Sequence, residues 1–231
     1  MTKRSSTPAD AVLVAIDMSK HRQEVLIERT SRKGIVGNIY KGKVSRVLPG
    51  MEAAFIDIGL ERAAFLHVAD IWDARPQGVE GNTNNLPLIP IEKLLYDGQA
   101  ITVQVVKDPI GTKGARLSTQ VSIAGRMLVY LPQDSHIGIS QRIEDEVERE
   151  SLRNKVQSLQ QENEKGGFIV RTMAEDASDE DLKSDVEYLR RTWSTITKLA
   201  KTLPPSTLLH QDLNLAQRVL RDFVNEETES I

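Results

Sequence analysis

Residues 37–67 read GNIYKGKVSRVLPGMEAAFIDIGLERAAFLH, and they decide the fold of this chain. Three short runs rich in β-branched and aromatic residues lie in this stretch, and glycines separate them. Such runs are typical of consecutive antiparallel strands with tight turns. Pro49-Gly50 supplies the first turn, because proline and glycine favour the backbone angles that turns require. We therefore expect three strands, at 39–47, 53–58 and 63–66.

The second of these strands predicts an aromatic face on the outside of the sheet. Side chains alternate between the two faces of a strand, so Phe55 points away from a core filled by Ala54 and Ile56. Phe65 can join it from the neighbouring strand. Four cations lie on or beside the same strands: Lys41, Lys43, Arg46 and Arg62. Rings that stack on bases, with cations that follow the phosphates, are typical of a surface that binds single-stranded nucleic acid.

Aromatic residues are scarce, which leaves a second interpretation of these two rings. Only four of the 231 residues are Phe, and scarce aromatic residues usually fill a hydrophobic core. Phe55 and Phe65 are therefore either stacking platforms or core residues, and both interpretations stay open at this point.

A second group of strands completes the predicted barrel. Residues 98–107 alternate as a strand, residues 108–114 (DPIGTKG) form a turn-rich loop, and residues 114–121 give a fifth strand. The first three strands are close together in the sequence, and a long connecting segment separates them from the last two. This order matches the OB-fold of the S-one type, a barrel that binds oligonucleotides. The connecting segment, residues 68–97, is expected as an insertion on the barrel rim.

Elements on both sides of the barrel make the predicted fold class α+β. Residues 11–16 and 24–29 read as a β-hairpin. Three helices are expected: over 141–165, from a capping box at Ser178 to Leu203, and after a cap at Asp212. We therefore expect a five-stranded OB-fold barrel inserted between an N-terminal hairpin and a mixed α/β region with three helices. The expected domains are a disordered tail at 1–10, the hairpin at 11–36, the barrel at 37–124, the mixed region at 125–211 and a last segment at 212–231.

Composition narrows the class of protein and of partner. The net charge is -3, but the charges are unevenly distributed. Residues 37–68 and 99–129 hold eight Lys or Arg and four acidic residues, whereas the chain from residue 140 onward holds thirteen Lys or Arg and nineteen acidic residues. A basic barrel beside an acidic region localises a polyanion site. The chain has no cysteine, which fits a reducing cytoplasm. No apolar run reaches the roughly 20 residues of a membrane span, and the opening MTKRSSTPAD lacks a secretory signal. We expect a cytoplasmic location.

Motifs for catalysis are missing from the sequence. The four histidines are scattered and none has metal-ligand spacing. The sequence contains no phosphate-cradling GxxxxGK[ST] loop and no GxSxG motif. Asp57 is the only acid inside an apolar strand, and one carboxylate cannot hold the pair of metal ions that a nuclease usually employs. The residues therefore predict a chain that binds without cutting, with no catalytic residue and no metal site.

Arg171 and Thr172 form the pair that we single out after the barrel. They end a predicted buried strand at 168–172, which follows Gly166-Gly167. At a strand end a bidentate guanidinium and a hydroxyl can converge on one terminal phosphate. The alternative is that Arg171 neutralises the acids at 175, 176 and 179–181.

Five motifs in this order resemble the ribonuclease E/G family. They are residues 38–67, VQVVKDPIGTKGARLSTQVS, SHIGISQRIEDEVERESL, GGFIVRT and LNLAQRVLRDF. The resemblance covers about residues 24–228. It implies that 11–36 belongs to a ribonuclease-H-like lobe, that 37–124 is the S-one-type RNA-binding domain, and that 125–211 senses a 5′-monophosphate on RNA. Residues 212–231 would be the start of a second segment of the ribonuclease-H-like lobe, truncated at residue 231.

The resemblance also implies residue roles. Arg171 and Thr172 would grip the 5′-phosphate, and Gly125 and Val129 would line its pocket. Phe55, Phe65 and Lys113 would hold single-stranded RNA on the barrel.

The family's catalytic domain, with two aspartates that bind Mg²⁺, lies beyond residue 231, as does its cysteine-containing zinc-linking motif. The resemblance therefore implies an endoribonuclease whose complete form uses Mg²⁺ and can carry zinc, forms a homo-oligomer and acts on single-stranded RNA that includes ribosomal RNA precursors. For this chain alone we expect no cofactor and no cutting. The alternatives are a free-standing S-one-type RNA-binding module and a scaffold whose barrel binds protein.

Overall fold

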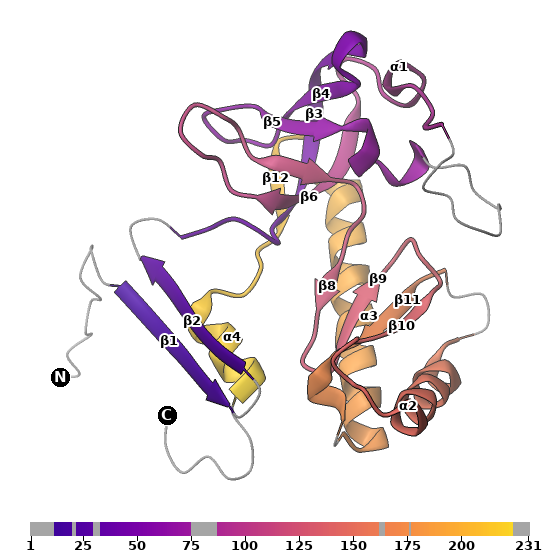
Figure 1. Ribbon diagram of the computed structural model, residues 1–231. Coiled ribbons are helices and arrows are strands. Elements are labelled where there is room, and N and C mark those ends of the chain that lie inside the picture. The colour runs from indigo at the N-terminus through magenta and orange to yellow at the C-terminus, as the bar shows by residue number, and fades with distance from the viewer. Residues whose placement is uncertain are drawn as a thin grey trace. The chain divides into compact units, whose positions relative to one another are not determined.

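The computed structural model describes residues 12–19, 22–29, 33–74, 87–161, 165–175 and 177–223. The predicted tail at 1–10 lies outside the described residues, as does part of the rim insertion. The chain divides into two compact units, one of Met1–Ile35 with Asp212–Ile231 and one of Val36–Gln211 (Figure 1). Each unit is described by itself below.

The smaller unit contains the expected hairpin and the last helix. Strand β1 (Val12–Ser19) pairs antiparallel with β2 (Arg22–Arg29), and α4 spans Leu215–Phe223. The side chain of Asn214 accepts a hydrogen bond from the Gln217 N–H at 2.9 Å, and the Gln217 side chain accepts one from the Asn214 N–H at 3.0 Å. Asn214 therefore caps α4 rather than Asp212, which instead pairs with Arg218 at 2.7 Å.

The larger unit begins with a closed barrel of five strands, which confirms the predicted fold class. Its strands are β3 (Ile39–Leu48), β4 (Ala53–Asp57), β5 (Ala64–His67), β6 (Ala100–Lys107) and β7 (Arg116–Ser118). They follow the order β3-β4-β5-β7-β6, and β6 pairs back onto β3. The β5–β7 pair is parallel and the others are antiparallel. Strand β12 (Thr207–His210) is not one of the five barrel strands, and it pairs antiparallel with β3.

The barrel interior follows the predicted alternation. Ile56 and Leu66 are fully buried, as are Val103 and Leu117 from the opposite strands. The fifth strand is shorter than the predicted 114–121, because the chain turns after Ser118. There the Ser118 hydroxyl and the Thr119 N–H both donate to the carbonyl of Asp70, at 3.0 Å each. Short helical turns cover the rim: η1 (Pro49–Met51), η2 (Val68–Asp70), η3 (Trp72–Ala74) and α1 (Ile91–Leu94).

A second sheet follows the barrel within the same unit (Figure 1). Its strands are β8 (Ile123–Ala124), β9 (Leu128–Leu131), β10 (Ile137–Ile139) and β11 (Gly167–Val170), in the order β10-β11-β9-β8. Two helices accompany the sheet, α2 (Glu146–Leu159) and α3 (Asp179–Thr202), and the turn η5 (Thr172–Ala174) precedes α3.

Helix α2 is shorter than the predicted 141–165. The Asp145 side chain accepts a hydrogen bond from the Glu148 N–H at 2.8 Å and so begins the helix. The helix ends at Leu159, where Gln160 becomes extended. At α3 the predicted capping box is confirmed, because the side chains of Ser178 and Asp181 each accept a hydrogen bond from the other's N–H.

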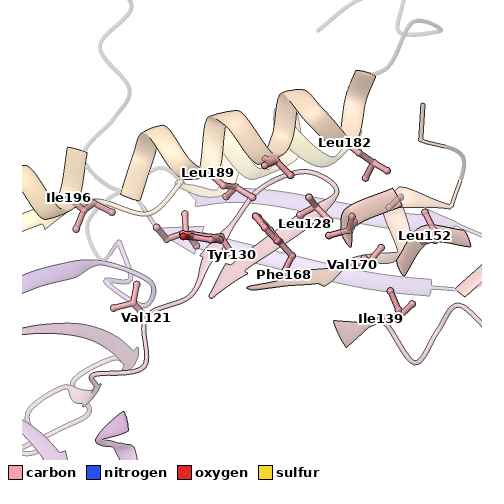
Figure 2. Packing of buried hydrophobic residues seen from close by; sticks show 14 of the residues in the cluster. Val121, Leu128, Tyr130, Ile139, Leu152, Phe168, Val170, Leu182, Leu189 and Ile196 are labelled. Atoms are coloured by element: carbon pink, nitrogen blue, oxygen red, sulfur yellow. The ribbon is translucent and has the colours of Figure 1, made fainter. Parts of the chain in front are cut away.

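Helix α3 packs one apolar face on the sheet. Leu182, Val186, Leu189 and Ile196 are buried at spacings of three, four and seven residues. Figure 2 shows Leu189 directed toward Tyr130 of β9 and Phe168 of β11, whose ring centroids lie 5.1 Å apart. Ile39 and Leu209 belong to the same buried cluster. These two residues come from β3 and β12, so the core of the second sheet reaches the strands at the near end of the barrel.

Asp57 ties the barrel to the segment before β12. Its carboxylate accepts hydrogen bonds from the Gly59 N–H at 2.9 Å and from the Ser206 hydroxyl at 2.7 Å. Both donors favour the ionised carboxylate, so they hold the pKa of Asp57 below its ordinary value.

We expect Asp57→Asn to remove a pH-dependent part of the stability. The pKa is lower in the folded chain than in the unfolded chain, where it is about 3.9. The ionised group therefore stabilises the fold above about pH 4, and this contribution is lost as the pH falls through the folded pKa. Urea denaturation should show that the gap in unfolding free energy between wild type and variant shrinks below about pH 4. A gap that stays constant across this range would contradict the assignment.

Candidate functional site

The two barrel phenylalanines lie together on the outside of the barrel. Phe55 on β4 is directly opposite Phe65 on β5, and their ring centroids are 6.3 Å apart in an edge-to-face arrangement. Phe55 is 38% exposed and Phe65 is half-buried, whereas their strand neighbours Ile56 and Leu66 are fully buried. The rings therefore do not fill the barrel core, and they present an aromatic surface to the solvent.

Two of the predicted cations flank this aromatic surface. Arg46 pairs in register with Phe55, and Lys43 pairs with Asp57 on the same two strands. Both basic side chains are exposed. The face therefore carries stackable rings beside positive charge, which is the combination that holds a single strand by its bases and its phosphates.

Two further predicted cations come from loops at the end of the barrel. Arg62 donates a hydrogen bond from its guanidinium to the carbonyl of Gly111. Lys113 is exposed, and its N–H and carbonyl both bond to Ile110, with N to O distances of 3.0 and 3.2 Å. The loop that carries Lys113 then runs beside β5, where the Phe65 N–H donates to the carbonyl of Ala115 at 2.7 Å.

Lys41 has a different position from the other barrel cations. It is half-buried, and its Nζ donates to the carbonyl of Leu203 at 2.7 Å. Leu203 is the C-cap of α3, so the ammonium satisfies a carbonyl at the negative end of that helix. Lys41 thus contributes to holding α3 against the barrel.

The predicted phosphate-binding residues converge on the loop between β8 and β9. The Arg171 guanidinium donates to the carbonyls of Gly125 at 2.6 Å and Arg126 at 3.0 Å, and its backbone N–H donates to Met127 at 2.8 Å. Thr172 follows directly at the start of η5, and Val129 lies on β9 opposite Ile169. Arg171, Thr172 and Val129 are half-buried. The structure therefore brings Arg171 and Gly125 into contact, with Thr172 and Val129 on the adjoining segments.

Asp185 of α3 holds the same loop through hydrogen bonds from the loop's backbone N–H groups. Its carboxylate accepts three hydrogen bonds, from the N–H groups of Arg126 at 3.1 Å, Met127 at 2.9 Å and Leu128 at 2.8 Å. A Cβ at position 125 would lie 2.5 Å from both carboxylate oxygens, so a side chain there would displace the Asp185 carboxylate. The sequence did not reveal Asp185, because one acid in a charged helix resembles any other solvated residue.

We expect Asp185→Ala to destabilise this loop and the chain. Three backbone N–H groups would lose a charged acceptor, and leaving such donors unpaired costs about 1–3 kcal/mol. Urea denaturation should show this loss of unfolding free energy for Asp185→Ala. Glu187→Ala is the matched control, because Glu187 is exposed on the same helix and should change stability by no more than about 0.5 kcal/mol. Equal stability of the two variants would show that the loop does not depend on Asp185.

The described residues were also compared with the requirements of a metal site and of a membrane-spanning helix. Among them, no group of three or more His, Cys, Asp or Glu residues is placed to hold a metal ion. The resemblance implies Mg²⁺, but these residues do not provide a fitting ligand set, so we assign no step through that ion to this chain. None of the helices in the described ranges is both long and apolar enough to cross a membrane.

The sequence of this chain is similar to those of several known proteins. Residues 122–231 match the model of the ribonuclease E/G family. The chain is 48% identical over 225 residues to ribonuclease G of Escherichia coli (strain K12) and 46% identical to ribonuclease G of Haemophilus influenzae. Each of these alignments covers 97% of this chain and 45% of the relative. Ribonuclease E of Synechocystis sp. is 35% identical over 210 residues, or 90% of this chain and 29% of that protein. The chain thus spans about half the length of the ribonuclease G relatives, and over that length it is similar to members of the ribonuclease E/G family.

Proposed function

We propose that this chain is the RNA-gripping part of a ribonuclease G-like endoribonuclease, which in its complete form cleaves single-stranded RNA with a 5′-monophosphate. The observation that carries the proposal is the Phe55–Phe65 pair on the outside of the barrel, 6.3 Å between centroids and flanked by Lys43 and Arg46. Two rings on a sheet surface are suited to stacking on successive bases, and every base has a face to stack.

The second part of the proposal concerns the end of the RNA. Arg171 and Thr172 would contact a terminal phosphate, with Gly125 and Val129 lining the pocket. The supporting geometry is the set of hydrogen bonds that holds the loop after β8. Arg171 donates to two carbonyls of this loop, and Asp185 accepts from three backbone N–H groups. A loop fixed from both sides is pre-organised, which lowers the entropy that phosphate binding would cost.

The activity of the complete protein is part of the same proposal. We assign hydrolysis to Mg²⁺ held by two aspartates, and zinc to a cysteine motif, in segments outside this sequence. Its substrates would include ribosomal RNA precursors, it would act as a homo-oligomer, and its location would be cytoplasmic. The domain division at 37–124 and 125–211 stays as predicted from the sequence.

We expect this chain by itself to bind single-stranded RNA and not to cut it. The physical reason is that Mg²⁺-assisted cleavage needs a carboxylate set to hold the ion. The test incubates chain prepared free of host nucleases with Mg²⁺ and a labelled 5′-monophosphorylated oligonucleotide, beside a binding titration of the same RNA. Binding with intact RNA supports the proposal. Cleavage that copurifies with the chain contradicts the non-cutting part, and absence of RNA binding favours a protein-binding scaffold instead.

A further inference from the structure

Arg126 is the residue at which the two supports of the loop after β8 meet. Its N–H donates to the carboxylate of Asp185 at 3.1 Å, and its carbonyl accepts from the guanidinium of Arg171 at 3.0 Å. These two bonds fix the backbone of Arg126, and its side chain takes part in neither of them. The sequence did not single out Arg126, because one arginine beside an apolar strand matches no motif.

The guanidinium of Arg126 lacks a partner within the described ranges. Arg126 is half-buried, and its Nε is shielded from solvent without a hydrogen-bond acceptor. The same guanidinium forms no ion pair with the acidic residues of those ranges. A buried N–H without an acceptor costs free energy in the folded state. This side chain therefore loses little when it turns outward to an anion, and it gains an acceptor by doing so.

The two guanidinium groups at this loop point to different places. Arg171 donates to the carbonyls of Gly125 at 2.6 Å and Arg126 at 3.0 Å. The pKa of Asp181, in the first turn of α3, is held below its ordinary value chiefly by hydrogen bonds from the Ser178 hydroxyl and N–H, and to a smaller extent by the charge of Arg126. The Arg126 side chain therefore lies toward the start of α3. Two cations at two positions suit two phosphates better than one.

We propose that Arg126 binds the phosphate that joins the first and second nucleotides of the RNA, next to the terminal phosphate on Arg171. This inference rests on the proposed function of the loop, and it adds a residue and a second phosphate to that site. Because Arg126 and Arg171 meet at one loop, the first linkage is the nearest further anion of a bound strand. A guanidinium suits it, since two N–H groups can donate to two phosphate oxygens. The loop then recognises a unit of two phosphates at the 5′ end.

The test neutralises one phosphate and one cation in combination. The probes are two 5′-monophosphorylated oligouridylates with a 2′-deoxy sugar at the first nucleotide, and they differ only in a neutral methylphosphonate at the first linkage. Wild type should bind the neutralised probe about five- to twentyfold more weakly, which is the lower part of the range for a charge-assisted contact because Asp181 shares the charge of Arg126. Arg126→Ala should show the same loss with the unmodified probe and no further loss with the neutralised one.

Three results would overturn the inference. The first is equal affinity of wild type for the two probes. The second is wild-type affinity of Arg126→Ala for the unmodified probe. The third is a further loss on the neutralised probe that is as large for Arg126→Ala as for wild type, because the side chain would then act somewhere other than the first linkage. A probe with the methylphosphonate at its third linkage is the matched control, and it should weaken wild type and Arg126→Ala equally.

Further variants separate the charge of Arg126 from its packing. Arg126→Gln keeps much of the side-chain length without the charge and should match Arg126→Ala, whereas Arg126→Lys should recover part of the affinity for the unmodified probe only. Thermal melting of each variant accompanies the titrations. Arg126→Ala removes an unpaired N–H, so its melting curve should stay close to that of wild type. If Arg126→Ala unfolds, Arg126→Gln takes its place in the same comparison.

Salt dependence distinguishes a phosphate contact from a structural role. One phosphate contact on a single strand contributes about 0.7 to the slope of log affinity against log salt concentration. Arg126→Ala should lower the slope by about this amount, and an unchanged slope would contradict the contact. Arg191→Ala is the control for the probes, because Arg191 is exposed on α3. Neutralising the first linkage should cost this variant as much affinity as it costs wild type.

Arg171→Ala keeps this inference apart from the proposed function. If Arg171→Ala abolishes the preference for a 5′-monophosphate and Arg126→Ala responds to both probes like wild type, only the assignment of Arg126 is wrong. If wild type has no preference for a 5′-monophosphate over a 5′-hydroxyl, the loop does not read the end of the RNA, and the proposed function fails at this site.

Discussion

In a titration with matched oligonucleotides, Arg171→Ala is expected to abolish the preference of this chain for a 5′-monophosphate over a 5′-hydroxyl. A charge-assisted contact to phosphate is worth about 1.5–3 kcal/mol, which corresponds to roughly ten- to a hundredfold in affinity. Arg171→Lys should lose most of the preference as well. An ammonium keeps the charge but has no planar fork, and it would also have to replace the bonds to the carbonyls of Gly125 and Arg126.

The control for this prediction removes an arginine at another position of the chain. Arg191 is exposed on α3, so Arg191→Ala should lower the affinity for both oligonucleotides equally and leave the preference intact. If wild type binds the two oligonucleotides with equal affinity and Arg171→Ala changes neither value, Arg171 serves only to hold the loop. The 5′-phosphate assignment would then be wrong.

Phe55→Ala and Phe65→Ala are each expected to weaken the binding of single-stranded RNA by about 1–3 kcal/mol, because each change removes a ring that stacks on a base. Isothermal titration with a 5′-hydroxyl oligonucleotide isolates this effect from phosphate recognition. Phe55 is exposed on the outer face, so its loss should leave the thermal melting curve nearly unchanged. Phe65 is half-buried and should cost some stability in addition.

Tyr96→Ala is the matched control for the phenylalanines. Tyr96 is 69% exposed and follows the short helix α1, outside the strands β4 and β5 that carry the two phenylalanines, so its removal should not affect RNA binding. If Phe55→Ala binds RNA with wild-type affinity, or if it collapses the melting curve, the stacking role is refuted.

The barrel could be predicted from the sequence because its signals are local. Alternation along residues 53–57 distinguishes the buried Ile56 from the exposed Phe55, and no distant residue is needed to make that distinction. Pro49-Gly50 and the capping box at Ser178 are equally local, and both are found where they were expected. The apolar residues of α3 recur every three or four positions, and Leu182, Val186, Leu189 and Ile196 among them are buried.

The remaining features depend on contacts between residues far apart in the chain. The role of Asp185 arises because α3 brings it to the loop at 126–128. The position of Lys41 arises because Leu203, the C-cap of α3, lies beside β3. Neither contact leaves a periodic pattern in the sequence. The start of α2 was placed too early because residues 141–145 are polar enough for a helix surface, whereas Asp145 supplies the cap.

The central claim is that one single-stranded RNA contacts both the Phe55–Phe65 pair on the barrel and the loop held by Arg171. The most direct measurement is an NMR titration of the isotope-labelled chain with a 5′-monophosphorylated oligonucleotide, and with the 5′-hydroxyl form as a reference. We predict that both oligonucleotides shift the backbone signals of Phe55 and Phe65, and that only the phosphorylated one shifts those of Gly125, Val129, Arg171 and Thr172. Shifts confined to other surfaces, or identical shifts at Arg171 with both oligonucleotides, would contradict the account.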